Sequence, residues 1–125
     1  MKYFWPVSNS LTALYEAAVV GLAAALMHKW AALDSDDFGR LLSAISILGF
    51  HTLALLVTGR QLASDKLIKC VVLFWHSGLW LFCWTLFAGV LTLPFYYTAL
   101  APLGGQILII GWLMLVVSAW QKDIK

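Results

Sequence analysis

Residues 70–121 read "CVVLFWHSGLWLFCWTLFAGVLTLPFYYTALAPLGGQILIIGWLMLVVSAWQ" and contain no Asp, Glu, Lys or Arg. The hydrocarbon core of a bilayer is about 30 Å thick, and one helix crosses it with about 20 apolar residues. The stretch is therefore long enough for two membrane-spanning helices joined by a turn. Pro94 and Pro102 mark that turn, and Pro102 suits the first turn of the helix that follows.

The chain as a whole is also strongly apolar. Hydrophobic residues make up 62% of its 125 residues, charged residues make up 11%, and the mean hydropathy is +0.88. A soluble domain of this size cannot bury so much apolar surface. Backbone groups in lipid must be paired within a segment, so each span is expected to be a helix. The sequence therefore predicts an all-α fold, a four-transmembrane-helix bundle in a single domain over residues 1–125, with spans at about residues 11–30, 41–58, 70–93 and 103–120.

The ends of the chain are expected to lie in the cytoplasm. Glu16 interrupts the first apolar run, which favours a retained span over a cleaved signal peptide. With four spans, most basic residues share one side of the membrane: Lys2, Arg60, Lys66, Lys69, Lys122 and Lys125. Lys29 and Arg40 lie on the other side, beside several aspartates. Because cytoplasmic loops are enriched in Lys and Arg, this distribution places both termini inside.

Small residues recur at regular spacing in two of the spans. The first span carries a stripe with a spacing of four: Ala13, Ala17, Gly21 and Ala25. The last span carries a stripe with a spacing of seven: Gly104, Gly111 and Ser118. Small residues on one face let helix backbones approach closely in a membrane. We expect packing within the bundle, with a contact between copies of the chain as the alternative.

Three ionisable residues fall within the predicted spans, namely Glu16, His51 and His76. Helix rise places all three at a similar depth from the cytoplasmic side. Ionisable groups inside a membrane are costly and usually face a partner or a wet cavity. We expect an intramembrane polar layer, in which Glu16 accepts a hydrogen bond from a histidine. A proton path through the layer, or haem or metal ligation by His51 and His76, are the alternatives. His28 is expected to be an interfacial ring beside Lys29.

Several short motifs resemble those of a known family. In chain order they are "FHTLALL" (Phe50–Leu56), "LFAG" (Leu86–Gly89), "PLGG" (Pro102–Gly105) and "GWLML" (Gly111–Leu115). Together they resemble the domain-of-unknown-function 423 family of small bacterial inner-membrane proteins, which is similar to the eukaryotic transmembrane protein 256. His28 and His51 fit the family pattern, whereas Glu16 and His76 do not belong to it. Ala88, Val90 and Thr92 stand where the family pattern is richer in serine. The resemblance implies four spans in a bacterial inner membrane and supplies no activity.

The sequence contains no phosphate-binding loop, nucleophile elbow or zinc-spaced Cys/His cluster. We therefore expect a non-enzymatic accessory or interaction subunit without a cofactor, whose partners are the lipid bilayer and a larger membrane complex or further copies of itself, and not nucleic acid. The alternatives are an oligomeric protein that transports protons, ions or small solutes through the Glu/His layer, and a redox subunit that binds haem.

Overall fold

A computed structural model describes residues 3–61 and 66–123 of the chain. All regular structure in these two ranges is helical. The four helices are α1 (Phe4–His28), α2 (Ser35–Gln61), α3 (Lys66–Leu91) and α4 (Leu100–Asp123). By length and composition, each of them can cross a membrane. The all-α fold and the four membrane-length helices predicted from the sequence are confirmed.

The helix ends follow from local sequence signals. Asp34 caps α2, because its carboxylate oxygen accepts hydrogen bonds of 3.0 Å from the backbone N–H groups of both Asp36 and Asp37. Such a cap pairs N–H groups that have no partner inside the helix. Pro102 lies in the first turn of α4, where its missing N–H costs nothing. Thr92 and Phe95 have positive φ angles of 53° and 61° and form part of the connection between α3 and α4.

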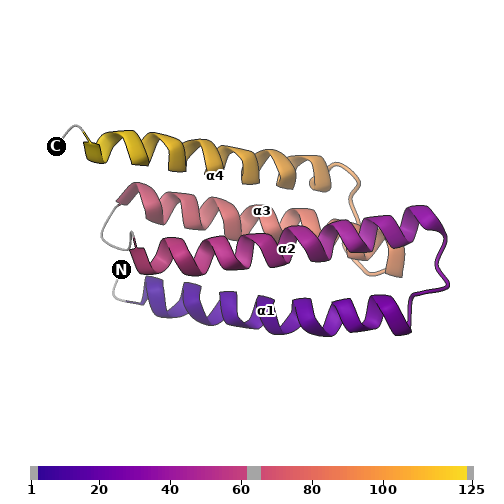
Figure 1. The fold of residues 1–125 in the computed structure, drawn as a ribbon. Helices are drawn as coiled ribbons and strands as arrows, with labels where there is room; N and C mark the ends of the chain where they lie inside the picture. The colour runs from indigo at the N-terminus through magenta and orange to yellow at the C-terminus, as the bar shows by residue number, and fades with distance from the viewer. Residues whose placement is uncertain (1–2, 62–65, 124–125) are drawn as a thin grey trace.

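The helices run antiparallel to their neighbours in sequence, and α2 and α3 lie between α1 and α4 (Figure 1). The backbone of α1 packs on α2, α2 packs on α3, and α3 makes its most extensive contact with α4. As a result, α1 begins and α4 ends at the same end of the molecule (Figure 1). Of the basic residues predicted to share that side, Lys2 and Lys125 lie outside the described residues.

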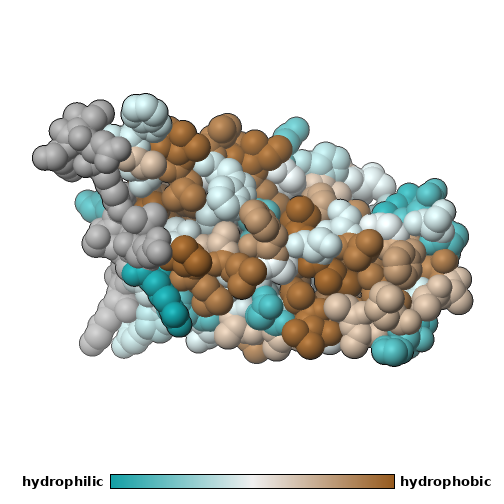
Figure 2. All heavy atoms as spheres, viewed as in Figure 1, coloured by the Kyte–Doolittle hydropathy of each residue, from teal (hydrophilic) through white to brown (hydrophobic). Residues whose placement is uncertain are grey.

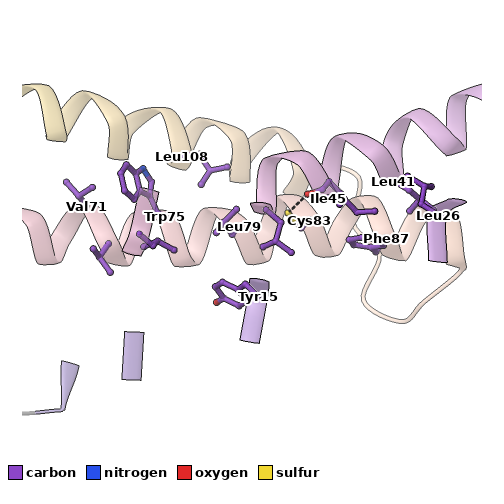
Figure 3. Close-up of a cluster of buried hydrophobic side chains, with 14 of the residues drawn as sticks. Tyr15, Leu26, Leu41, Ile45, Val71, Trp75, Leu79, Cys83, Phe87 and Leu108 are labelled. Atoms are coloured by element: carbon purple, nitrogen blue, oxygen red, sulfur yellow. Dashed lines mark hydrogen bonds between the residues drawn. The ribbon is translucent and has the colours of Figure 1, made fainter. Parts of the chain in front are cut away.

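Hydrophobic side chains cover most of the middle of the face seen in Figure 2, while most hydrophilic ones lie toward its two ends. The interior is apolar as well, and Trp75 and Leu79 of α3 and Leu108 of α4 form part of one buried cluster (Figure 3). Cys83 of α3 donates a weak hydrogen bond to the Ala44 carbonyl oxygen of α2, with the two atoms 3.5 Å apart. The membrane-spanning length thus combines a buried apolar core with an apolar exterior.

Glycines set the distance between α3 and α4. A Cβ atom at Gly104 would lie 2.5 Å from the backbone nitrogen of Phe82 and 2.9 Å from the carbonyl oxygen of Gly78. A Cβ atom at Gly111 would lie 2.6 Å from two atoms of the Trp75 indole ring. Both glycines are buried, as is Ser118 one heptad further on. This stripe of α4 is therefore buried within the chain.

The small-residue stripe of α1 behaves differently. Ala13, Ala17 and Gly21 are exposed, Ala25 is partly exposed, and a Cβ atom at Gly21 would meet nothing within 4 Å. The expectation that this stripe packs against another helix of the same chain is therefore wrong. The helix buries a different face, which carries Tyr15 and Leu26. Hydropathy did not distinguish the two faces, because apolar side chains suit both lipid and a protein interior.

Candidate functional site

The residues of the predicted polar layer lie at one level of the fold, on three helices. Tyr15 of α1 contacts His76 of α3. The next residue of α1, Glu16, contacts Thr52 of α2. The His51 ring, beside Thr52, lies 5.9 Å from the ring of Trp75, which precedes His76. Three pairs of consecutive residues thus meet at the same depth, namely Tyr15–Glu16, His51–Thr52 and Trp75–His76.

His51 is held by two hydrogen bonds as a neutral ring. It is 4% exposed, and its Nδ1 lies 2.9 Å from the Ile47 carbonyl oxygen one turn earlier. Because a carbonyl oxygen can only accept, Nδ1 carries the proton. Nε2 is then free to accept, and Trp112 of α4 donates its Nε1–H to it across 3.0 Å. Both ring nitrogens are satisfied inside the protein.

The rings around His51 form an aromatic cluster between α2, α3 and α4. The Trp75 and Trp112 ring centroids lie 4.6 Å apart, and Phe50 lies 5.6 Å from Trp112. Trp75 is fully buried, and its Nε1 has no hydrogen-bond partner among the described residues. Such clusters contribute packing energy beyond the area that they bury. This arrangement fixes the Trp112 indole so that its N–H points at His51.

Glu16 has a partner other than histidine. Its Oε2 accepts a hydrogen bond of 2.6 Å from the hydroxyl of Thr52, which is fully buried. The same hydroxyl lies 2.7 Å from the Gly49 carbonyl oxygen on its own helix. The expected hydrogen bond from a histidine to Glu16 does not occur among the described residues. The α1–α2 interface satisfies Glu16 locally.

His76 belongs to a third set of contacts, between α3 and α1. Its Nε2 lies 2.9 Å from the Ser8 hydroxyl, and its Nδ1 lies 3.2 Å from the Tyr15 hydroxyl. Trp80, one turn further along α3, donates its Nε1–H to the same Tyr15 oxygen across 2.9 Å. These side chains bridge two helices whose backbones are not in close contact.

The layer therefore consists of three separate sets of contacts. Glu16, His51 and His76 share a depth, but no hydrogen bond joins any two of them. His51 bonds toward α4 and His76 toward α1, so the protein does not present the two rings to a common ligand. Within the described residues, no group of three His, Cys, Asp or Glu side chains is placed to hold a metal ion. His28, the last residue of α1, is exposed at the end of the helix.

The sequence reasoning missed Trp112 and Tyr15 as partners of the histidines. A signal for Trp112 was present, because tryptophan is usually enriched at the membrane–water interface and this one falls in the middle of a span. For Tyr15 the signal was its position directly before Glu16. In both cases the missing information was the rotation of the outer helix about its axis.

A comparison with models of known protein families places this arrangement in context. Residues 20–105 match the model of a family described as "Protein of unknown function (DUF423)". The chain belongs to the DUF423 family. The matched residues include His51 and His76, whereas Glu16 and Trp112 lie outside them. No curated protein and no solved structure matches the chain.

Proposed function

We propose that this DUF423 protein is a non-enzymatic accessory subunit that attaches to a larger membrane complex through the outer face of α1. One comparison between helices carries the proposal. In both α1 and α4, 17% of the most apolar segment is buried within the chain. The outward residues of α4 are bulky, among them Ile109, Leu113 and Val117, as expected for a face that meets lipid. The exposed surface of α1 also carries bulky residues, Leu14, Val20 and Met27, but it adds a stripe of small ones, Ala13, Ala17 and Gly21.

A face of small residues is the type through which membrane helices associate, because it lets two backbones come into van der Waals contact. The separate hydrogen-bond sets of Glu16, His51 and His76 support a stabilising role for the polar layer. They do not favour a proton path, which needs connected groups, or a haem held between the two histidines. In this proposal the polar layer stabilises the fold, and the outer face of α1 binds the partner.

Gly21→Leu tests the proposed attachment. We expect this variant to fold normally, because a side chain at Gly21 meets nothing in the chain, but to lose the partner, because leucine separates the two helix backbones. The measurement is purification from native membranes in a gentle detergent, with the partner identified by mass spectrometry. Gly39→Leu is the matched control, since Gly39 is an exposed helical glycine that also lacks neighbours within 4 Å.

A photo-cross-linking residue at position 17 separates the possible outcomes. An adduct with a different polypeptide supports the accessory role, and an adduct with a second copy shows a homo-oligomer instead. Adducts with lipid alone, together with an unchanged set of co-purifying proteins in Gly21→Leu, would contradict an attachment through this face.

The orientation proposed here is that both termini lie in the cytoplasm. Arg60 and Lys66 lie at the end of the molecule where α1 begins and α4 ends, which supports this assignment by the distribution of basic residues. A reporter fused after Lys125 should therefore report a cytoplasmic location, as should one fused before Met1. A periplasmic signal from either fusion would reverse the assignment.

A further inference from the structure

A groove with a volume of about 510 Å³ lies between α1 and α3. Its lining is almost entirely apolar. Leu11, Ala18 and Leu22 line it from α1, and Trp84 and Leu91 line it from α3. It exists because α1 packs its backbone on α2, so that side chains alone bridge the distance from α1 to α3. The groove is open on one side and faces the surrounding membrane.

Toward the inner end of the groove, hydrogen bonds connect the two helices that line it. The Tyr15 hydroxyl accepts from Trp80 across 2.9 Å and lies 3.2 Å from His76, so these side chains join the two helices directly. An α-helix with its side chains is about 10–12 Å wide and cannot lie along a gap that is bridged in this way. A single hydrocarbon chain is much narrower and fits. The polar atoms at this end are already bonded to one another, so they leave no site for a polar ring.

The length of the groove corresponds to one leaflet of a bilayer. On α3 its lining runs from Leu79, near the middle of the helix, to Leu91 at its end. Twelve residues of α-helix span about 18 Å. Half of the hydrocarbon core of a bilayer is about 15 Å, the depth that one acyl chain fills. The groove thus covers the leaflet on the side away from the termini.

A free positive charge stands at the mouth of the groove. Lys29 follows Leu11, Ala18 and Leu22 at intervals of seven, four and seven residues, so helical geometry places it on the same face of α1. Its backbone is still helical, with its N–H bonded to the Ala25 carbonyl oxygen at 2.8 Å.

Two of the three nearby aspartates, Asp34 and Asp37, already have partners of their own. Arg40 pairs with Asp37 at 3.1 Å, and the Asp34 carboxylate accepts two backbone N–H groups. The Lys29 side chain is exposed, and among the described residues none bonds to its ammonium group. It complements the negative charge of a phosphate at the membrane surface.

We propose that this groove is a lipid-binding site, which holds one acyl chain of a phospholipid from the leaflet away from the termini and places its phosphate beside Lys29. The groove adjoins the outer face of α1, since Gly21 follows the lining residues Leu14 and Ala18 on the helix, but its ligand is proposed separately from the attachment above. It gives the protein a specific lipid ligand that stabilises the otherwise open side of the fold between α1 and α3.

Filling the groove tests the proposal. The full chain is reconstituted into vesicles of phosphatidylethanolamine and phosphatidylglycerol, extracted gently, and examined by native mass spectrometry. Ala18→Trp places an indole ring in the groove, and we expect it to reduce the retained phospholipid about tenfold. Val20→Trp adds the same ring to the opposite, exposed face of the same helix and should retain the lipid. Equal phospholipid retention by the two variants would overturn the proposal. So would a result in which Ala18→Trp keeps the phospholipid but loses a bound quinone or a second copy of the chain.

Two further measurements locate the lipid and its head group. In the unmodified protein, a phospholipid with a photoreactive acyl chain should label α3 between Leu79 and Leu91 more strongly than it labels α4. Lys29→Gln should weaken retention of phosphatidylglycerol by about fivefold, the effect of one lysine at an anionic surface. Uniform labelling of the four helices would show that the chain is ordinary bulk lipid, and unchanged retention in Lys29→Gln would remove the head-group assignment.

Discussion

Gly104→Ala is expected to lower the free energy of unfolding by at least about 2 kcal/mol, although alanine is intrinsically the better helix former by about 1 kcal/mol. The added methyl group would lie 2.5 Å from the Phe82 nitrogen and 2.9 Å from the Gly78 oxygen, and both of these are backbone atoms. A side chain could rotate away, but a backbone can respond only if α3 and α4 separate. Since α3 and α4 form the most extensive helix contact of the fold, separating them loses packing along its whole length.

The neighbouring glycine is the control. A methyl group at Gly105 would lie 3.8 Å and 4.0 Å from two ring atoms of Phe82, which is ordinary van der Waals contact. Gly105→Ala should therefore be neutral or slightly stabilising. Reversible unfolding in mixed micelles, followed by circular dichroism, measures both variants. If the two substitutions have equal effects, the close approach of α3 and α4 at Gly104 is not present in solution.

His51→Leu is expected to lower the free energy of unfolding by about 1–3 kcal/mol. The substitution removes the acceptor for the Trp112 Nε1–H, and that donor is then left unpaired in an apolar environment. His28→Leu is the matched control, because His28 is exposed at the end of α1 and makes no hydrogen bond through its ring among the described residues.

A double-mutant cycle identifies which group His51 is coupled to. His51→Leu and Trp112→Phe should show a coupling energy of about 0.6–1.7 kcal/mol, from the average to the maximum found for hydrogen bonds between membrane helices. His51→Leu and Glu16→Leu should instead be additive, because Glu16 bonds to Thr52 and not to His51. A substantial coupling between His51 and Glu16 with none to Trp112 would restore the histidine–carboxylate pair predicted from the sequence.

Much of the fold follows from the sequence because it depends on local physics. The number of spans follows from the length of uncharged apolar segments, and the start of α2 follows from the Asp34 cap. The close packing of α4 was also predictable, since Gly104 and Gly111 recur on one helical face. These features need no knowledge of how the helices rotate against one another.

The polar layer shows where that reasoning ends. Helix rise placed Glu16, His51 and His76 at one depth, and the structure places them at one level. Depth does not identify partners, because the partner of a side chain depends on the direction in which each helix faces. The sequence therefore suggested a bond between His51 and Glu16, whereas the tertiary structure pairs His51 with Trp112 and Glu16 with Thr52.

The sequence by itself determined that this is a membrane protein of four apolar helices, because spanning length and backbone pairing depend on each segment alone. An even number of spans also brings the two ends of the chain to the same side. The tertiary structure decided which face of each helix is inside. In a soluble protein, the hydrophobic effect would show that face as a stripe of apolar residues. In a membrane, lipid and protein interior are equally apolar, so the inward face is chosen by packing and hydrogen bonds. That choice turned the small residues of α1 outward and opened the groove between α1 and α3.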